Sequence, residues 1–77
     1  MKVQLTLIAS YRDFLPPENE GKAEIDVPEG TTAVSILTDF GVPLEETVIL
    51  VDGRTPEPGQ TLQEGNVVFA FHATAGG

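Results

Sequence analysis

The chain has to fold without cross-links, because none of its 77 residues is cysteine. Neither a disulfide nor a thiolate-held metal can stabilise it, and a single core in a chain below roughly 70–80 residues seldom contributes more than about 3–5 kcal/mol. Apolar residues make up 40% of the sequence, too many for a disordered segment, and no apolar run approaches the roughly 20 residues of a membrane-spanning helix. The sequence therefore predicts one small domain with a regular core.

The charge balance narrows the range of partners. Twelve Asp and Glu residues against four Lys and Arg residues give a net charge of -8. Such a chain repels phosphate groups, so neither nucleic acid nor an anionic membrane is expected to bind it. The first residues, MKVQLTLIAS, lack the continuous apolar stretch of a signal peptide, which favours a cytoplasmic protein. The acidic surface can attract a basic partner or serve solubility alone.

The first half of the sequence predicts two strands and a short helix. Residues 2–10 alternate apolar and polar side chains, as a half-buried strand does. After a loop rich in breaking residues over 13–21, the alternation resumes over 22–27, which favours a hairpin. Thr31 or Thr32 can cap a helix before Gly41 and Pro43 end it. The side chains expected to face the core are Val3, Leu5, Leu7, Ala9, Ala23, Ile25, Val27, Ala33, Ile36, Leu37 and Phe40.

The second half predicts two further strands. Residues 48–51 form an apolar run, which indicates a strand buried on both sides or one that leads into a tight turn at Asp52-Gly53. Residues 54–66 contain several Pro and Gly residues and are expected to be irregular, with Leu62 inserted into the core. The last strand covers residues 67–72. One of its sides carries Val68 and Ala70, and the other carries Phe69 and Phe71.

This order of elements indicates an α+β fold, with one main helix packed on one face of a mixed sheet of four to five strands. By analogy, it suits a β-grasp arrangement in which the first and last strands are parallel neighbours at the sheet centre. Phe69 and Phe71 then face away from the helix, with Ile8 beside them. Exposed aromatic side chains indicate a partner. Alternatively, one ring packs under the loop at 11–21.

Three motifs carry a resemblance to a known family. They are Ile-Ala-Ser-Tyr-Arg-Asp at 8–13, Val-Asp-Gly at 51–53, and Leu-Gln-Glu-Gly-Asn-Val-Val at 62–68 leading to a terminal Gly-Gly. With these motifs the chain resembles the MoaD/ThiS sulfur carrier proteins, which are prokaryotic relatives of ubiquitin. The resemblance implies a single β-grasp domain over 1–77. The small residues at 73–77 have nothing to pack against and are expected to form a flexible tail.

The resemblance implies a carrier that is a substrate of other enzymes and has no catalytic activity of its own. In the family, a MoeB/ThiF-type adenylating enzyme uses ATP to activate the terminal glycine, here Gly77, which becomes a thiocarboxylate. A sulfur-accepting enzyme then consumes it, either the large subunit of molybdopterin synthase or an enzyme of the thiazole synthase type. Gly76 and Gly77 suit a narrow channel because glycine has no side chain. The small side chain of Ala75 keeps the segment before them narrow as well.

The resemblance also implies a docking surface. Ile8 and Phe71 match the apolar patch with which the family contacts both enzymes, and Phe69 and Ala75 are expected to contact the partner as well. No bound cofactor and no metal are expected, and the free carrier is expected to be a monomer. The single histidine, His72, has no second histidine or Ser-centred motif to act with, so a structural role at the end of the strand is expected.

The choice of pathway stays open at this point. Tyr11-Arg12-Asp13 favours molybdopterin synthesis, whereas Asp52 and His72-Ala73 depart from the Asn and Pro-Pro frequent in those carriers. Carriers for thiamine synthesis, tRNA thiolation, cysteine synthesis or tungsten-cofactor assembly are alternatives. A ubiquitin-like modifier would use the same adenylate but join Gly77 to lysines of target proteins. A third alternative is a binding module that uses only its aromatic patch.

Overall fold

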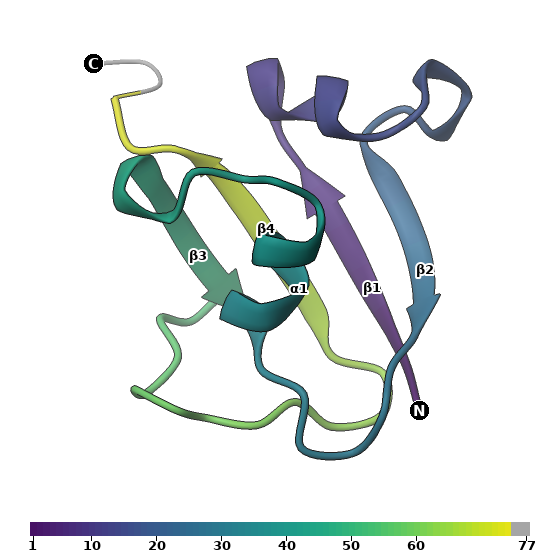
Figure 1. Ribbon diagram of the computed structural model, residues 1–77, viewed down its shortest axis with the longest axis vertical. Helices are drawn as coiled ribbons and strands as arrows, with labels where there is room; N and C mark the ends of the chain where they lie inside the picture. Colours follow the sequence, from purple (N-terminus) through teal and green to yellow (C-terminus); the bar gives the residue numbers. More distant parts are fainter. Residues whose placement is uncertain (75–77) are drawn as a thin grey trace.

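In the computed structural model, which describes residues 1–74, four strands form one mixed sheet in the order β2-β1-β4-β3 (Figure 1). β1 and β4 run parallel at its centre, and each pairs with an antiparallel outer strand. One helix, α1, covers one face. This is the predicted arrangement. The elements are β1 (Lys2–Leu7), η1 (Ala9–Phe14), η2 (Pro17–Asn19), β2 (Lys22–Asp26), α1 (Ala33–Asp39), η3 (Leu44–Glu46), β3 (Thr47–Val51) and β4 (Val67–His72), where η denotes a 3-10 helix.

The core lies between α1 and the two central strands. Leu5 and Val68 are opposite each other in the parallel register, and both are fully buried. Leu62 is also buried, as predicted, and its N–H donates to the carbonyl of Thr31. The buried apolar side chains are Val3, Leu5, Leu7, Tyr11, Leu15, Ala33, Ile36, Leu37, Val42, Val51, Leu62, Val68 and Ala70. Tyr11, Leu15 and Val42 were not predicted to be in the core.

Helix α1 begins at a capping box. The N–H of Ser35 donates to Thr32 Oγ1, and the N–H of Thr32 donates to Ser35 Oγ, at 3.2 and 3.3 Å. Of the two predicted caps, Thr32 is therefore the one used. These bonds satisfy N–H groups that have no partner within the helix. The helix ends before Gly41, which has a positive φ of 81°.

The first strand is shorter than its alternation predicts. β1 ends at Leu7, and Ala9 has a positive φ of 56°, a left-handed conformation that a strand cannot continue. The expectation that Ala9 faces the core is therefore wrong, and its side chain is exposed. The chain turns into η1 instead, and η1 buries Tyr11.

The apolar run at 48–51 belongs to an edge strand that leads into a turn at Asp52-Gly53, so the second of the two predicted alternatives is confirmed and burial on both sides is wrong. Ile49 pairs with Ala70 and faces the core, whereas Val48 and Leu50 pair with Phe71 and Phe69 on the other face. Both faces of β3 are apolar because each meets apolar side chains of β4.

Asp52 has a structural role in the turn after β3. Asp52 and Gly53 both have positive φ, at 51° and 82°, and Val51 and Arg54 exchange two backbone hydrogen bonds around them. The Asp52 carboxylate accepts the N–H of Val67 at 2.9 Å and the side-chain amide of Asn66 at 2.6 Å. An acidic residue at this position therefore fixes the start of β4.

Candidate functional site

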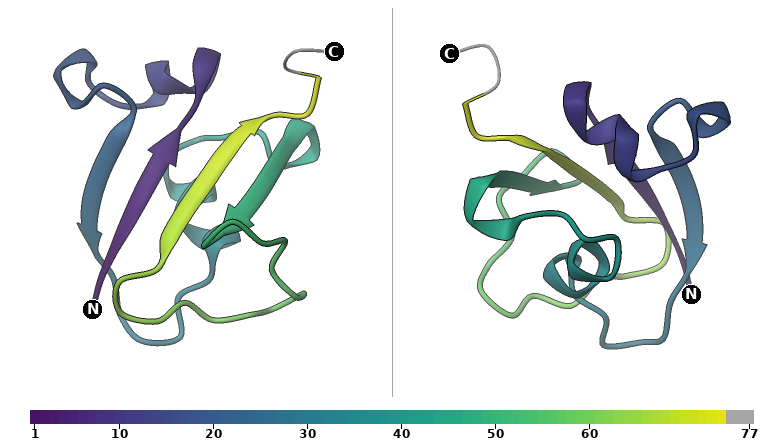
Figure 2. Two further views of the ribbon diagram at one scale, coloured as in Figure 1. Left: turned by 180° about the vertical axis from the view of Figure 1, so that it is seen from behind. Right: turned by 45° about the horizontal axis from the view of Figure 1, so that its top comes forward.

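The face of the sheet opposite α1 carries a group of apolar side chains. The left view of Figure 2 shows this face, which no helix covers. In the register of the strands, Leu50 is opposite Phe69, and Val48 is opposite Phe71. Ile8 continues β1 with extended backbone, and its N–H donates to the carbonyl of Ala70, which brings it beside Phe71. We call Ile8, Val48, Leu50, Phe69 and Phe71 the open-face patch.

The sequence predicted the position of the two phenylalanines but overestimated their exposure. Phe69 and Phe71 are half-buried among the other residues of the patch, whereas Ile8 is 41% exposed. The alternative, a ring packed under the loop at 11–21, is not supported. Tyr11 of that segment packs against His72 and Thr47, which by register lie on the α1 side of the sheet.

A charged strip lies on the same face of the sheet as the open-face patch, at the start of β1 and on β2. Lys2 Nζ lies 3.2 Å from Asp26 Oδ1 and 3.9 Å from Glu24 Oε1, and all three side chains are well exposed. The hydrogen bond to Asp26, together with attraction by the two carboxylates, raises the pKa of Lys2 above its ordinary value. Lys2 is therefore a stable cation within an acidic strip, so a partner that extends beyond the patch meets paired charges.

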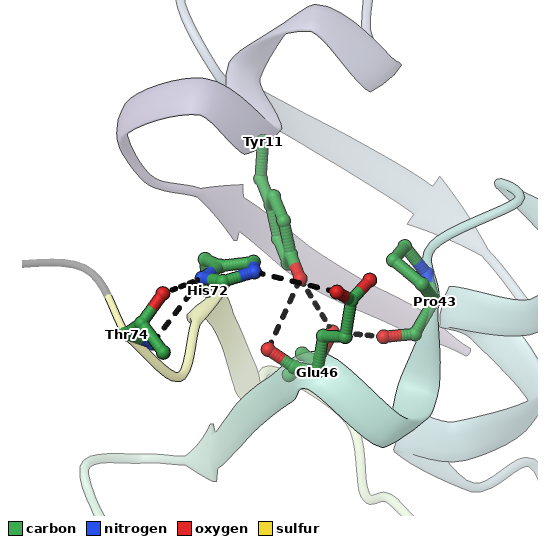
Figure 3. A network of polar contacts seen from close by, with 6 residues as sticks. Tyr11, Pro43, Glu46, His72 and Thr74 are labelled. Atoms are coloured by element: carbon green, nitrogen blue, oxygen red, sulfur yellow. Dashed lines mark hydrogen bonds and ion pairs between the residues drawn. The ribbon is translucent and has the colours of Figure 1, made fainter.

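The end of β4 lies in a second cluster of contacts, on the α1 side of the sheet (Figure 3). His72 Nδ1 accepts the N–H of Thr74 at 3.2 Å, and the N–H of Ala73 donates to the Glu46 carbonyl at 2.7 Å. The side chain of Tyr11 reaches the same carbonyl at 3.3 Å. His72 is half-buried at the end of the strand, and its ring holds Thr74 through the hydrogen bond to Nδ1. The pairing of Tyr11 with Glu46 spans 35 positions, and no local motif indicates it.

Of the predicted site residues, the structure brings Ile8, Phe69 and Phe71 together. Their contact with a partner stays a prediction. Ala75, Gly76 and Gly77 lie outside the described residues. Within the predicted tail, Ala73 and Thr74 both make the hydrogen bonds given above.

Two kinds of site are absent from the part of the chain that the structure describes. Across residues 1–74, no group of three or more His, Cys, Asp or Glu side chains is placed to hold a metal ion. Over the same residues, no helix has the length and apolarity needed to cross a membrane.

The sequence matches the family described as Mut7-C ubiquitin over residues 1–75. No curated protein matches it. A protein from Pyrococcus furiosus assigned as molybdopterin converting factor, subunit 1, is similar in structure, with a TM-score of 0.73, 21% identity, and coverage of 94% of this chain and 97% of its own. SAMP1 from Haloferax volcanii is similar with a TM-score of 0.72 and 14% identity, and each chain is fully covered. These likenesses confirm the predicted β-grasp, ubiquitin-like fold.

Proposed function

Because this chain belongs to the Mut7-C ubiquitin family, we propose that it is a sulfur carrier whose Gly77 carboxyl group is converted to a thiocarboxylate. One observation carries the proposal: the two aromatic side chains of the open-face patch, Phe69 and Phe71, lie on β4, and the Gly-Gly sequence follows that strand in the chain. Phe71 precedes Gly77 by six residues. The five residues after His72 span at most about 18 Å. A partner that docks on the patch therefore needs an active site within that reach.

The chemistry needs no catalytic group from the carrier. A carboxylate oxygen of Gly77 attacks the α-phosphorus of ATP, pyrophosphate leaves, and an acyl-adenylate forms in the adenylating enzyme. A sulfide equivalent then attacks the acyl carbon, and AMP leaves with the electrons of the C–O bond. The sequence has no thiol that could carry sulfur. The terminal acyl group is therefore the group of this chain that is suited to hold transferable sulfur.

The first experiment is the intact mass of the protein isolated from its own cells, because the proposal requires that the natural chain end at Gly77. Purified protein is then incubated with ATP, sulfide and a MoeB/ThiF-type adenylating enzyme. The expected product is heavier by the replacement of one oxygen by sulfur. A natural chain that continues past Gly77, or a wild-type protein that forms neither adenylate nor thiocarboxylate, would overturn the proposal.

We assign the acceptor to molybdopterin synthesis in preference to thiamine synthesis or tRNA thiolation. The fold shared with the Pyrococcus furiosus protein supports this choice. Asp52 stands where carriers for molybdopterin synthesis frequently have Asn, but this difference is weak evidence against the choice. The Asp52 carboxylate has a structural role, because it binds Asn66 and Val67 from the turn after β3. Incubation of the thiocarboxylate with the large subunit of molybdopterin synthase tests the assignment, and sulfur transfer to a thiazole synthase alone would reject it.

Conjugation to other proteins is the second candidate function, and the likeness to SAMP1 is the observation that favours it. Both functions begin with the same adenylate but differ in the nucleophile that follows, a sulfide or a lysine amine. Immunoblots of cell extracts with an antibody against this protein separate them. High-mass species that disappear when Gly77 is deleted from the chromosomal gene would indicate a modifier.

The open-face patch makes a separate prediction about docking. Phe71→Ala is expected to raise the KM of adenylation about 30-fold, because a central aromatic anchor contributes about 2 kcal/mol or more to an interface. The free energy of unfolding should fall by only about 1 kcal/mol, since the ring is half-buried. Steady-state kinetics and urea unfolding measure the two quantities.

Val34→Ala is the matched control for Phe71→Ala. Val34 is 50% exposed and lies on α1, on the opposite side of the sheet from the patch. Its variant should leave the KM unchanged. A Phe71→Ala variant with an unchanged KM and a stability loss of several kcal/mol would show that the ring supports the fold and not the docking.

A further inference from the structure

His72 holds the first residues beyond the sheet through one ring nitrogen. Its Nδ1 lies 3.2 Å from the backbone nitrogen of Thr74 and 2.6 Å from Thr74 Oγ1. A backbone N–H can only donate, so Nδ1 must carry a free lone pair and the ring proton must be on Nε2. Nε2 points toward Glu46 Oε1 at 3.7 Å, and this carboxylate favours the same tautomer (Figure 3).

The imidazole ring is itself held in place. The edge of one ring meets the face of the other between Tyr11 and His72, with centroids 6.0 Å apart and planes at 90°. The Tyr11 hydroxyl lies 2.9 Å from Thr47 Oγ1. Since the single proton of Thr47 is donated to the Pro43 carbonyl at 2.6 Å, the Tyr11 hydroxyl is the donor to Thr47. The orientation of His72 is therefore set by η1 and η3, two elements distant in sequence.

Two successive amides after β4 are bound to different groups. The N–H of Ala73 extends the ladder by donating to the Glu46 carbonyl, and the N–H of Thr74 turns to its own neighbour, His72. Both Ala73 and Thr74 are exposed, so no apolar packing fixes them. The direction in which the chain leaves the sheet is thus defined by these hydrogen bonds.

We infer that His72 is a positioning residue that fixes this direction and so presents the chain end to the adenylating enzyme from a preset starting point. The inference rests on the proposed function, because it assigns His72 a part in the activation of Gly77. Once the carrier has docked, a correctly aimed carboxylate reacts faster than one that must first find its orientation. The open-face patch sets how tightly the carrier docks, whereas His72 sets how often the docked carrier reacts.

Two variants of His72 separate the acceptor from the rest of the ring. His72→Leu removes the acceptor. His72→Asn keeps it, because an Asn side-chain oxygen accepts the N–H two residues later in an Asx-turn. Backbone 15N relaxation and hydrogen exchange of the free carrier are measured at Thr74. The Thr74 amide should be rigid and protected in the wild type and in His72→Asn, and should lose both properties in His72→Leu.

The kinetic test uses the same variants with the adenylating enzyme. His72→Leu is expected to lower kcat about fivefold to tenfold with a KM within about twofold of the wild type, and His72→Asn should restore kcat. This is the opposite of the pattern expected for Phe71→Ala. A His72→Asn variant as slow as His72→Leu, or a raised KM with an unchanged kcat, would overturn the inference.

Thr74 provides a second pair of variants that does not depend on the folding of His72→Leu. Thr74→Pro removes the donor N–H at an exposed position, and Thr74→Ser keeps both the N–H and the hydroxyl. Thr74→Pro should reproduce the loss of kcat, and equal kcat values for Thr74→Pro and Thr74→Ser would refute the inference. Should the wild type not be adenylated at all, the proposed function fails, and the relaxation data still decide whether His72 anchors Thr74.

Discussion

Removal of Gly77 is expected to abolish acyl activation of the carrier. The shortened chain ends in Gly76, so its carboxylate is drawn back by one residue, about 3.3–3.6 Å. Because a misplacement of about 1 Å at a reacting centre can already reduce a rate about 100-fold, we expect a loss of at least that size. Pyrophosphate release and intact mass, measured with the adenylating enzyme at saturating carrier, report the loss.

Gly77→Ala is the control for this deletion. It keeps the carboxyl group the same number of residues from Thr74 and adds one methyl group. It therefore distinguishes a requirement for chain length from a requirement for a terminal residue without a side chain. Retained activity in Gly77→Ala, with none in the shortened chain, assigns the requirement to position. A shortened chain that is adenylated at the wild-type rate would mean that Gly77 does not carry the activated group.

Gly21→Ala is expected to lower the free energy of unfolding by about 3 kcal/mol, which is most of the stability that a core of this size provides. Gly21 has a positive φ of 81°, and a Cβ added there would lie 2.5 Å from the Leu7 carbonyl oxygen and 2.9 Å from Arg12 Cγ. The left-handed conformation alone costs an alanine about 1–2 kcal/mol. Relief of the backbone clash would disturb the hydrogen bond from the Leu7 N–H to the Gly21 carbonyl, now 2.7 Å long, for about 1 kcal/mol more.

Gly41→Ala is the matched control for Gly21→Ala. Gly41 has the same φ of 81°, but nothing lies within 4 Å of its added Cβ. Gly41→Ala should therefore lower the free energy of unfolding by about 1–2 kcal/mol, the cost of the left-handed conformation alone. The difference between the two variants in urea unfolding measures the part of the stability loss that comes from the close approach of Gly21 to β1. Equal losses of unfolding free energy in the two variants would contradict such a contribution.

Period-2 alternation was sufficient to predict the faces of β1 and β4, and hence the position of Ile8, Phe69 and Phe71 on one side of the sheet. It failed at Ala9, because a left-handed alanine carries no local signal of the kind that glycine provides. At β3 it could not decide between the two alternatives, a strand buried on both sides and a strand that leads into a tight turn. An edge strand that faces a core on one side and an apolar patch on the other has the same sequence pattern as a strand buried on both sides.

The cluster at the end of β4 could not be predicted from the sequence for a different reason. Its members come from η1, η3, β4 and the start of β3, and the contacts of Tyr11 join residues 35 or more positions apart, such as Tyr11 and Thr47. Neither periodicity nor a capping motif relates such positions. His72 could be identified as the single histidine, but its partners depend on how η1 and η3 meet over the sheet.

The position of Tyr11 gives this protein an internal spectroscopic probe. Tyr11 is the single tyrosine of a sequence without tryptophan, and it contacts both the His72 ring and the carbonyl that accepts the Ala73 amide. Incorporation of fluorotyrosine would therefore produce one fluorine resonance, which reports on the place where the chain leaves the sheet. A change in that resonance when an unlabelled enzyme is added would follow the engagement of the chain end directly, without any label on the residues that react.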